Sequence, residues 1–199
     1  MLRDLADRSR PPDARRPADA PEAALIARVA AGDLQAFEAL YRAYHPRLSR
    51  FIGLMNPRRS VVEEVLNDTM LVVWKRSGTY NHQCKVSTWI FAIAYRTALK
   101  AMRQQDEPVA AASPDELPSD AIGPEQQHCD RETRAALARA LDGLSAEQRS
   151  VLVLTYFHDL PCAEIARIVD CPIDTVKTRM FHGRRRLRAL LCGELGDWL

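Results

Sequence analysis

The chain has no apolar run long enough to cross a lipid bilayer, and its N-terminal segment lacks the apolar centre of a secretory signal. Its five cysteines are scattered and form no Cys-x-x-Cys pair. His82 with Cys84 and His128 with Cys129 could each supply half of a metal site, but their spacing fits packed or incidental thiols better. It also has no glycine-rich phosphate loop, metal-spaced carboxylate pair or nucleophile motif. We therefore expect a cytoplasmic protein that is not an enzyme and binds no metal or cofactor.

The charges nearly balance over the whole chain, with 28 Lys and Arg against 26 Asp and Glu, but they are segregated along it. No acidic residue occurs from Thr69 to Gln105, whereas residues 104–130 contain Asp, Glu, Pro and Ala but no Lys or Arg. A basic segment suits a nucleic-acid partner, and the acidic one is typical of a flexible linker.

Helical periodicity runs through nearly every long segment, and no segment alternates as a strand would. Two helices are expected within 22–53, joined at Gly32-Asp33, followed by helices capped by Ser60 and by Ser87 or Thr88. Beyond the linker, Ser145 opens a capping box before another helix. Two more helices are expected at 162–169 and, capped by Asp174 or Thr175, at 176–191.

The predicted fold is therefore all-α, with two small helical domains joined by a flexible acidic linker. The boundaries we expect are a disordered leader at 1–22, a first domain at 23–104, the linker at 105–131 and a second domain at 132–199.

The last two predicted helices are separated by a short turn, which is the helix-turn-helix arrangement. Apolar residues at helical spacing, including Ala163, Ile165, Ile173, Val176 and Met180, would pack the two helices together. The second helix then presents side chains that can reach base edges and phosphates in a major groove: Thr175, Lys177, Thr178, Arg179, His182 and Arg185. Arginines near a helix C-terminus also favour the helix dipole, which accounts for part of the basic cluster.

The helix after Ser87 combines cations with aromatic rings, a combination that suits single-stranded nucleic acid. Three cations recur at i, i+4 and i+7, and the rings lie beside them. The candidate residues are Lys85, Trp89, Phe91, Tyr95, Arg96, Lys100 and Arg103. Trp89 fits a core position better than a stacking platform, and Phe91 fits either.

The helix before it carries an acidic and amide-bearing face together with more apolar residues than one stripe can hold. Such a helix often packs on its own domain and on a partner. The candidate contacts are Glu63, Glu64, Asn67, Asp68, Val72 and Trp74. The alternative is a central bundle helix with no partner.

Taken in order, these segments resemble the sigma-70 family, specifically its two-domain extracytoplasmic-function members. The resemblance covers about residues 23–103 and 132–192. It rests on the stretches Phe37–Tyr41, Glu63–Trp74, Ser87–Arg96, Leu144–Arg149, Glu164–Ala166 and Thr175–Arg179.

The resemblance implies a first domain that is a promoter-melting helical bundle. It would bind core RNA polymerase through residues 63–74 and the melted −10 element through residues 85–103. The second domain would bind the −35 duplex through the final helix, and the linker would enter the polymerase channel. An anti-sigma factor is a further implied partner.

Three other interpretations stay open at this point. A conventional helix-turn-helix regulator would need a ligand or dimerisation domain, which the first module does not suggest. An enzyme acting on nucleic acid would need a catalytic motif. A sigma mimic that only sequesters an anti-sigma factor would tolerate loss of the DNA-facing cations, which are present.

Overall fold

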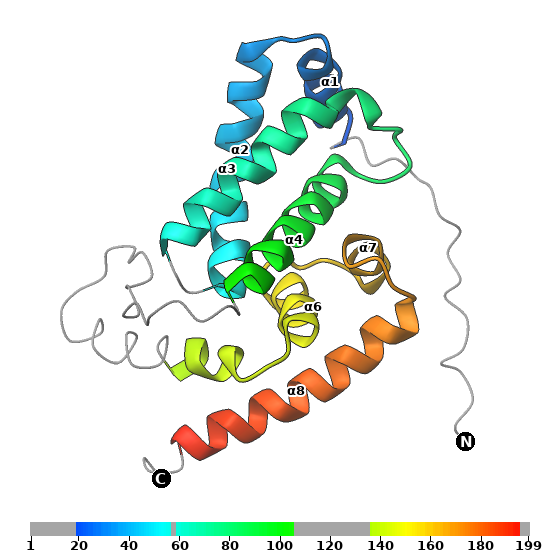
Figure 1. Ribbon diagram of the computed structural model, residues 1–199. Coiled ribbons are helices and arrows are strands. Elements are labelled where there is room, and N and C mark those ends of the chain that lie inside the picture. The colour runs from blue at the N-terminus through cyan, green and yellow to red at the C-terminus, as the bar shows by residue number, and fades with distance from the viewer. Residues whose placement is uncertain (1–18, 57–58, 106–135, 196–199) are drawn as a thin grey trace, which may run out of the picture.

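The computed structural model describes residues 19–56, 59–105 and 136–195, and within these ranges it contains helices and turns but no strand. The all-α prediction is therefore confirmed. Figure 1 shows the N-terminal helices as one group and the C-terminal helices as a second group beneath them. Residues 1–18 of the predicted leader and residues 106–131 of the predicted linker lie outside the described residues.

The described residues of the N-terminal half form four α-helices and one short 3-10 turn. In chain order they are α1 (Asp19–Ala30), α2 (Leu34–Met55), α3 (Arg59–Arg76), η1 (Ser77–Thr79) and α4 (Val86–Gln105). The C-terminal half has a helical segment at 136–142, then α6 (Ala146–Tyr156), α7 (Cys162–Ile168) and α8 (Ile173–Leu195).

The join between α1 and α2 forms where the sequence predicts it. Gly32 has a φ of 86°, which glycine adopts without steric cost. The Asp33 carboxylate caps α2 by accepting from the backbone N–H groups of Gln35 and Ala36, and it pairs with Arg28 at 2.7 Å. The N–H of Ala36, followed by the Arg28 guanidinium, holds the pKa of Asp33 below its usual value.

Several helices begin earlier than their predicted caps. Residues 19–22, expected in the leader, form the first turn of α1, and Ser60 follows the start of α3. Ser87 and Thr88 lie inside α4, because α4 begins at Val86, which is fully buried and starts the packed face. Asp174 and Thr175 likewise lie in the first turn of α8. The Ser145 cap is confirmed, since its hydroxyl accepts from the N–H of Gln148 at 3.3 Å.

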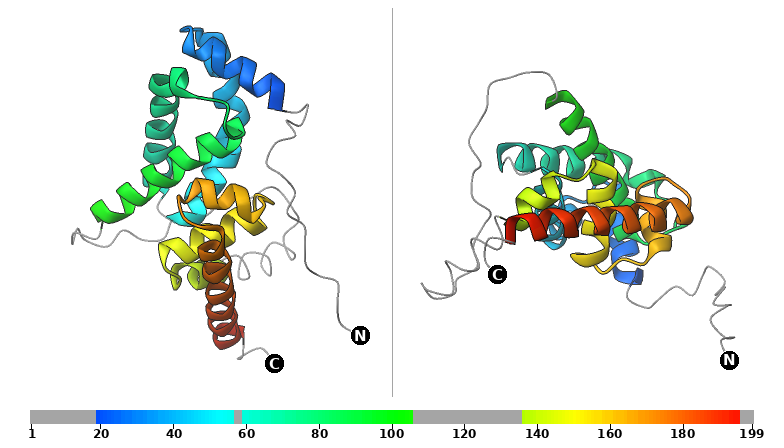
Figure 2. Two further views of the ribbon diagram at one scale, coloured as in Figure 1. Left: turned by 90° about the vertical axis from the view of Figure 1, so that its right-hand side faces the viewer. Right: turned by 90° about the horizontal axis from the view of Figure 1, so that it is seen from below.

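The two halves share one hydrophobic cluster. It contains buried residues of α1 to α4, including Phe51 and Phe91, and buried residues of α6 to α8, including Val151, Ile165 and Val176. Helix α4 packs against α7, and α2 packs against α6, as Figure 2 also shows. The predicted modules are therefore packed together in this structure, a contact that the sequence pattern did not predict.

The helix-turn-helix geometry is confirmed. Asp170 follows α7 with a φ of 52°, and the N–H of Cys171 donates to the carbonyl of Ala166 at 3.1 Å, which closes the turn. Gly183 lies where α8 crosses α6, and a Cβ there would meet Leu152 Cδ1 at 3.2 Å. The prediction that Ala163 and Ile173 belong to the packed face is wrong, because both residues are exposed.

None of the helices in the described ranges combines the length and apolar character that crossing a bilayer requires.

Candidate nucleic-acid interface

Helix α3 presents its acidic face to solvent. Glu63, Glu64 and Asp68 are exposed, and Asn67 is exposed with its side-chain oxygen accepting from the Tyr41 hydroxyl at 3.3 Å. The other two candidates of this helix, Val72 and Trp74, are half-buried. The ring of Trp74 packs edge-on against Phe37 with centroids 5.1 Å apart. Part of the Trp74 side chain therefore stabilises the helical bundle itself.

Leu71 belongs to the same exposed face of α3, although the sequence analysis did not select it. Its exposed fraction is 48%, and it lies three residues after Asp68 and seven after Glu64. An apolar side chain among exposed carboxylates gives this face both a hydrophobic contact and a negative rim. Its helical spacing from the acidic residues was the signal that could have identified it.

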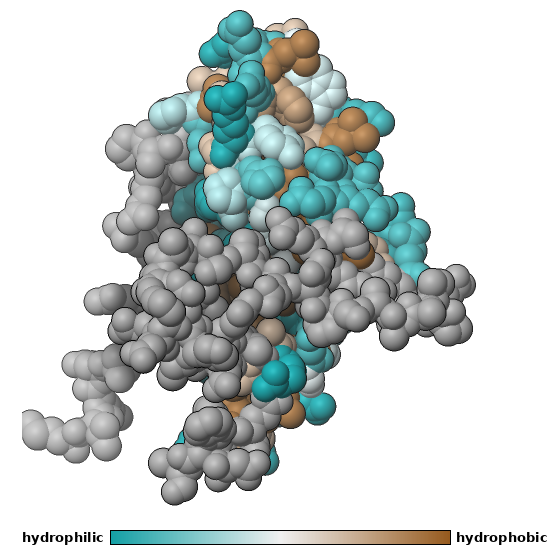
Figure 3. Space-filling model, turned by 90° about the vertical axis from the view of Figure 1, so that its left-hand side faces the viewer, coloured by the Kyte–Doolittle hydropathy of each residue, from teal (hydrophilic) through white to brown (hydrophobic). Residues whose placement is uncertain are grey.

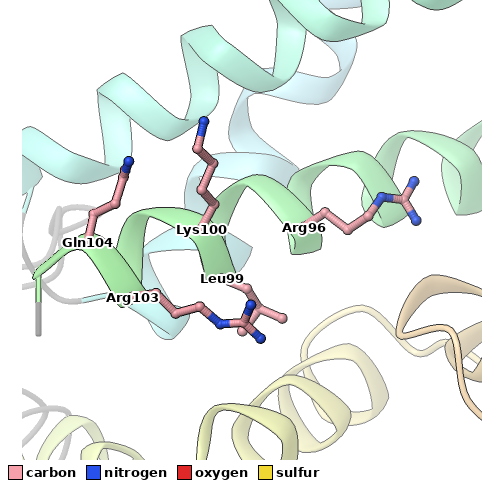
Figure 4. A pocket seen from close by; sticks show the side chains of 5 residues that line it. All are labelled: Arg96, Leu99, Lys100, Arg103 and Gln104. Atoms are coloured by element: carbon pink, nitrogen blue, oxygen red, sulfur yellow. The ribbon is translucent and has the colours of Figure 1, made fainter.

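The three cations predicted on α4 are exposed and lie along its C-terminal part. Arg96, Lys100 and Arg103 line an open pocket of about 590 Å³ together with Leu99 and Gln104. Figure 4 shows Leu99 and Arg103 pointing toward the C-terminal half, whereas Lys100 and Gln104 point toward α3. Among the described residues no carboxylate lines this pocket, so the charge of its described lining favours an anionic occupant such as a phosphate.

The aromatic candidates of α4 are not exposed with the cations. Phe91 has no exposed area and Tyr95 is 5% exposed, because the C-terminal half covers this face of α4. Burial is the main reason that the pKa of Tyr95 is raised, and Ser150 lies beside its phenol. Trp89 is half-buried and packs against Tyr80 with ring centroids 5.6 Å apart. Contact of Phe91 or Tyr95 with DNA would therefore require the halves to separate.

Helix α8 carries the remaining candidates, and most of them face solvent. Lys177, Thr178, His182 and Arg185 are exposed, whereas Thr175 and Arg179 are half-buried. Lys177 pairs with Asp174 at 3.0 Å across one turn, and both side chains are largely exposed, so this pair can be exchanged for DNA at little cost. The Arg179 guanidinium instead lies 3.6 Å from the sulfur of Cys171, on the inner side of the turn.

Phe181 is the residue on α8 that the sequence analysis missed. Its exposed fraction is 59%, and its ring packs against His182 with centroids 5.3 Å apart. It lies four residues after Lys177 and four before Arg185, on one face of the helix. An apolar ring flanked by cations suits contact with thymine methyl groups in a major groove.

A polar contact joins α7 to the start of α4. The Glu164 carboxylate forms an ion pair with Lys85 and accepts a hydrogen bond from Thr88 Oγ1 at 3.2 Å. Arg167 donates to the carbonyl oxygen of Gln83 at 3.2 Å. Lys85 is thus half-buried and already paired.

A second contact joins α6 and the loop after it to α2. The buried Arg149 donates to the carbonyl oxygen of Met55 at 2.8 Å and pairs with Asp142 at 2.8 Å. His158 packs against both Phe51 and Phe91, with ring centroids 6.0 and 4.9 Å away.

The thiols do not gather into a site within the described ranges. Cys84 is half-buried in the loop before α4, and burial raises the pKa of its thiol, which disfavours the reactive thiolate. His82 packs on Tyr80 with centroids 4.7 Å apart. His128 and Cys129 lie outside the described residues. No cluster of three or more His, Cys, Asp or Glu side chains suited to a metal occurs where the structure is described.

Within the ranges that the structure describes, exposed apolar side chains are few and scattered. The large ones there are Leu34, Leu71, Tyr156, Ile173 and Phe181. On the face in Figure 3, hydrophilic residues predominate where the chain is described, and hydrophobic residues show as separate patches. Charged surfaces therefore distinguish the candidate interfaces more clearly than apolar area does.

Comparison with known proteins agrees with this geometry. Residues 40–107 match the family described as Sigma-70 region 2, and residues 134–187 match the family described as Sigma-70, region 4. The chain is 31% identical over 170 residues to the ECF RNA polymerase sigma factor SigM of Mycobacterium tuberculosis, covering 85% of this chain and 84% of that protein. It is 29% identical over 160 residues to the ECF RNA polymerase sigma factor RpoE of Cereibacter sphaeroides, covering 78% and 86%.

Two solved structures share the fold. One is CnrH in complex with the cytosolic domain of CnrY, with a TM-score of 0.67 and 21% identity over 86% of this chain and 97% of that one. The other is the sigma factor RpoE in complex with the anti-sigma factor NepR from Bartonella quintana, with a TM-score of 0.63 and 24% identity over 78% and 96%.

Proposed function

Because this chain belongs to the extracytoplasmic-function branch of the sigma-70 family, we propose that it binds core RNA polymerase in the cytoplasm and directs promoter recognition, DNA melting and transcription initiation at stress- or signal-responsive promoters. The observation that carries the proposal is the order of three exposed surfaces along the chain. The acidic face of α3, the cationic face of α4 and the basic face of α8 follow one another in the order polymerase, −10 element and −35 element.

The charge of each exposed face indicates which class of partner it suits. The face made by Glu63, Glu64, Asp68 and Leu71 carries a net negative charge and would repel DNA, so it suits a protein partner. The cations of α4 and α8 attract phosphates, and their flanking polar and aromatic side chains add base contacts. One of the solved structures that share the fold is a sigma factor in complex with an anti-sigma factor, which supports an anti-sigma partner for this chain.

The direct test is run-off transcription with purified core polymerase on a library of genomic fragments, with and without the protein. Discrete new start sites that share −35 and −10 elements are expected. Duplex DNA binding without new start sites and without binding to core polymerase would instead indicate a conventional helix-turn-helix regulator.

Reversing the charge of Asp68 should weaken binding to core polymerase and leave DNA binding unchanged. Asp68 is exposed on α3, away from α8, so Asp68→Lys would place a cation on the acidic face. We expect at least about a tenfold loss of polymerase affinity. Competition against the wild-type chain for core polymerase measures it, with Glu38→Lys on the surface of α2 as the matched charge reversal. Equal competition by Asp68→Lys would contradict the assignment of α3.

Replacing Lys177 by alanine should weaken −35 duplex binding. Lys177 is exposed on α8 with Phe181 one turn away, and we expect a loss of about 1–3 kcal/mol if it reads a base edge. Titration of the selected promoter duplex in parallel with a scrambled one measures this loss. Arg42→Ala removes an exposed charge on α2 and is the control. An unchanged affinity of Lys177→Ala would exclude Lys177 from the interface.

A further inference from the structure

Two sulfur atoms meet where helices α6, α7 and α8 pack together (Figure 1). The thiol sulfur of Cys162, at the start of α7, lies 3.7 Å from the thioether sulfur of Met180 on α8. The hydroxyl oxygen of Thr155, near the end of α6, lies 3.8 Å from the same thioether sulfur. Cys162 and Met180 are 18 residues apart in the sequence, so only the fold brings these two sulfur atoms into contact.

The surroundings of the two sulfur atoms combine shielding with access. Met180 is 9% exposed, whereas Cys162 and Thr155 are half-buried, so the thiol side of the contact reaches solvent. Within the described ranges, no group of three or more His, Cys, Asp or Glu side chains is placed to hold a metal ion. The donors at this contact are therefore one thiol, one thioether and one hydroxyl.

This donor set is suited to a soft, monovalent metal ion. Thiolate and thioether sulfur atoms prefer Cu(I), whereas Ca²⁺ and Mg²⁺ take oxygen ligands. Structural Zn²⁺ sites normally have four protein ligands, and the described residues supply no such set here. One thiolate and one Cu(I) ion also cancel in charge, which lowers the cost of placing the ion in a packed region.

The separation of the two sulfur atoms fits a shared metal ion. Metal–thiolate bonds are about 2.3 Å long, so an ion bonded to both sulfur atoms at their present 3.7 Å separation has an S–metal–S angle of about 107°. That angle suits three- or four-coordinate geometry and leaves a position for the Thr155 hydroxyl or a water molecule. A linear ion would need sulfur atoms about 4.6 Å apart, which requires the helices to move.

We propose that Cys162 and Met180 form a Cu(I) site that connects α7 to α8. On binding, the S–H bond of Cys162 breaks, its proton passes to water, and the thiolate and the thioether each form a bond to the metal. No oxidation or reduction occurs in this step. The ion then ties together the two helices of the helix-turn-helix. The inference does not depend on the proposed function, because metal binding is measured without polymerase or DNA.

The first test is an anaerobic Cu(I) titration of the full-length chain in competition with the chromophoric chelator bicinchoninate. A single-thiol chain isolates the site because four cysteines are replaced by serine, namely Cys84, Cys129, Cys171 and Cys192. We expect this chain to retain one Cu(I) ion per molecule. Further replacement of the remaining thiol, Cys162→Ser, should abolish that binding.

The thioether is tested in the single-thiol chain by Met180→Leu, which keeps an apolar side chain of similar volume. We expect at least about tenfold weaker Cu(I) binding, because one of two sulfur ligands is lost. Met70→Leu makes the same change at a buried methionine of α3 and is the matched control. Circular dichroism checks that each variant keeps the helical content of the wild-type chain.

X-ray absorption at the copper edge supplies a measurement that needs no substitution at the site. The Cu(I)-loaded single-thiol chain should show two sulfur neighbours at about 2.3 Å, and Met180→Leu should show one. Cu(I) should also raise the melting temperature of the wild-type chain and leave that of the single substitution Cys162→Ser unchanged.

The outcomes that contradict the site are distinct from failure of the proposed function, which would appear as absence of assembly with core polymerase. Stoichiometric Cu(I) binding after Cys162→Ser in the single-thiol chain would overturn the proposal. Equal Cu(I) affinity of Met180→Leu and Met70→Leu would do the same, and so would a single sulfur neighbour in the Cu(I)-loaded single-thiol chain. Two sulfur neighbours, with binding that depends on both Cys162 and Met180, support the site.

Discussion

Replacing Phe51 by alanine is expected to lower the free energy of unfolding by about 3–5 kcal/mol, a large part of the stability of a domain of this size. Phe51 has no exposed area, and its ring packs at a steep angle on Phe91 with centroids 5.5 Å apart. It also contacts His158 from the other half of the chain. The truncation removes apolar area and leaves a cavity that the surrounding packed side chains close only in part.

Denaturant unfolding monitored by circular dichroism measures this loss through the midpoint and slope of the transition. Phe181→Ala makes the same truncation at a side chain that is 59% exposed and should cost less than about 0.5 kcal/mol. Because the hydrophobic cluster contains both halves, the wild-type chain should unfold in one transition. A loss below about 1 kcal/mol in Phe51→Ala would contradict this packing.

Acidification is expected to destabilise the contact between the halves through His158. Burial, followed by the charges of Arg47 and Arg50 on α2, lowers the pKa of His158 from 6.5 to about 4, and Asp159 opposes this shift only in part. Its Nε2 is buried and has no hydrogen-bond partner within the described residues. The ring therefore packs in its neutral form, and protonation favours states in which it reaches water.

The sign of the pH dependence follows from that lowered pKa. The stabilisation from neutral His158 is complete above pH 6.5 and is lost as the pH falls from 6.5 toward 4. The loss is at most about 1.4 kcal/mol per pH unit and is smaller here because the ring keeps part of its solvent contact.

Thermal unfolding between pH 7.5 and pH 5, from about one unit above to about one and a half units below the free-histidine pKa, measures the effect. His158→Phe retains an aromatic ring but cannot titrate, so its melting temperature should fall less than that of the wild-type chain over this range. His182→Phe removes an exposed histidine on α8 and should behave as the wild-type chain does. Parallel pH profiles for the wild-type chain and His158→Phe would exclude His158 as the titrating group.

Local features of the fold were predictable because they depend on neighbours in the sequence. The turn at Gly32-Asp33, the cap at Ser145 and the short connection at Asp170 each satisfy backbone groups within a few residues. Helix starts were less predictable, as at Val86, where burial of an apolar side chain extends the helix beyond the polar residue that seemed to cap it.

Exposure of single residues required the structure. Phe91 and Phe181 are both aromatic residues on amphipathic helices, yet the first has no exposed area and the second is 59% exposed. Helical periodicity places each on a face but does not say which second element covers that face. Leu71 has the helical spacing of the acidic residues on α3, but its degree of exposure depends on where α2 and α4 leave α3 uncovered.

The sequence by itself determined the helices, the two-part layout, the segregation of charge and, through ordered motifs, the family. These properties depend on composition and on spacing along one chain. Only the tertiary structure decided that Glu164 meets Lys85, that Arg149 meets Met55 and that His158 packs on Phe51 and Phe91. These partners are far apart in the sequence, and no periodicity encodes them, because each pair depends on how surfaces from distant parts of the chain fit together.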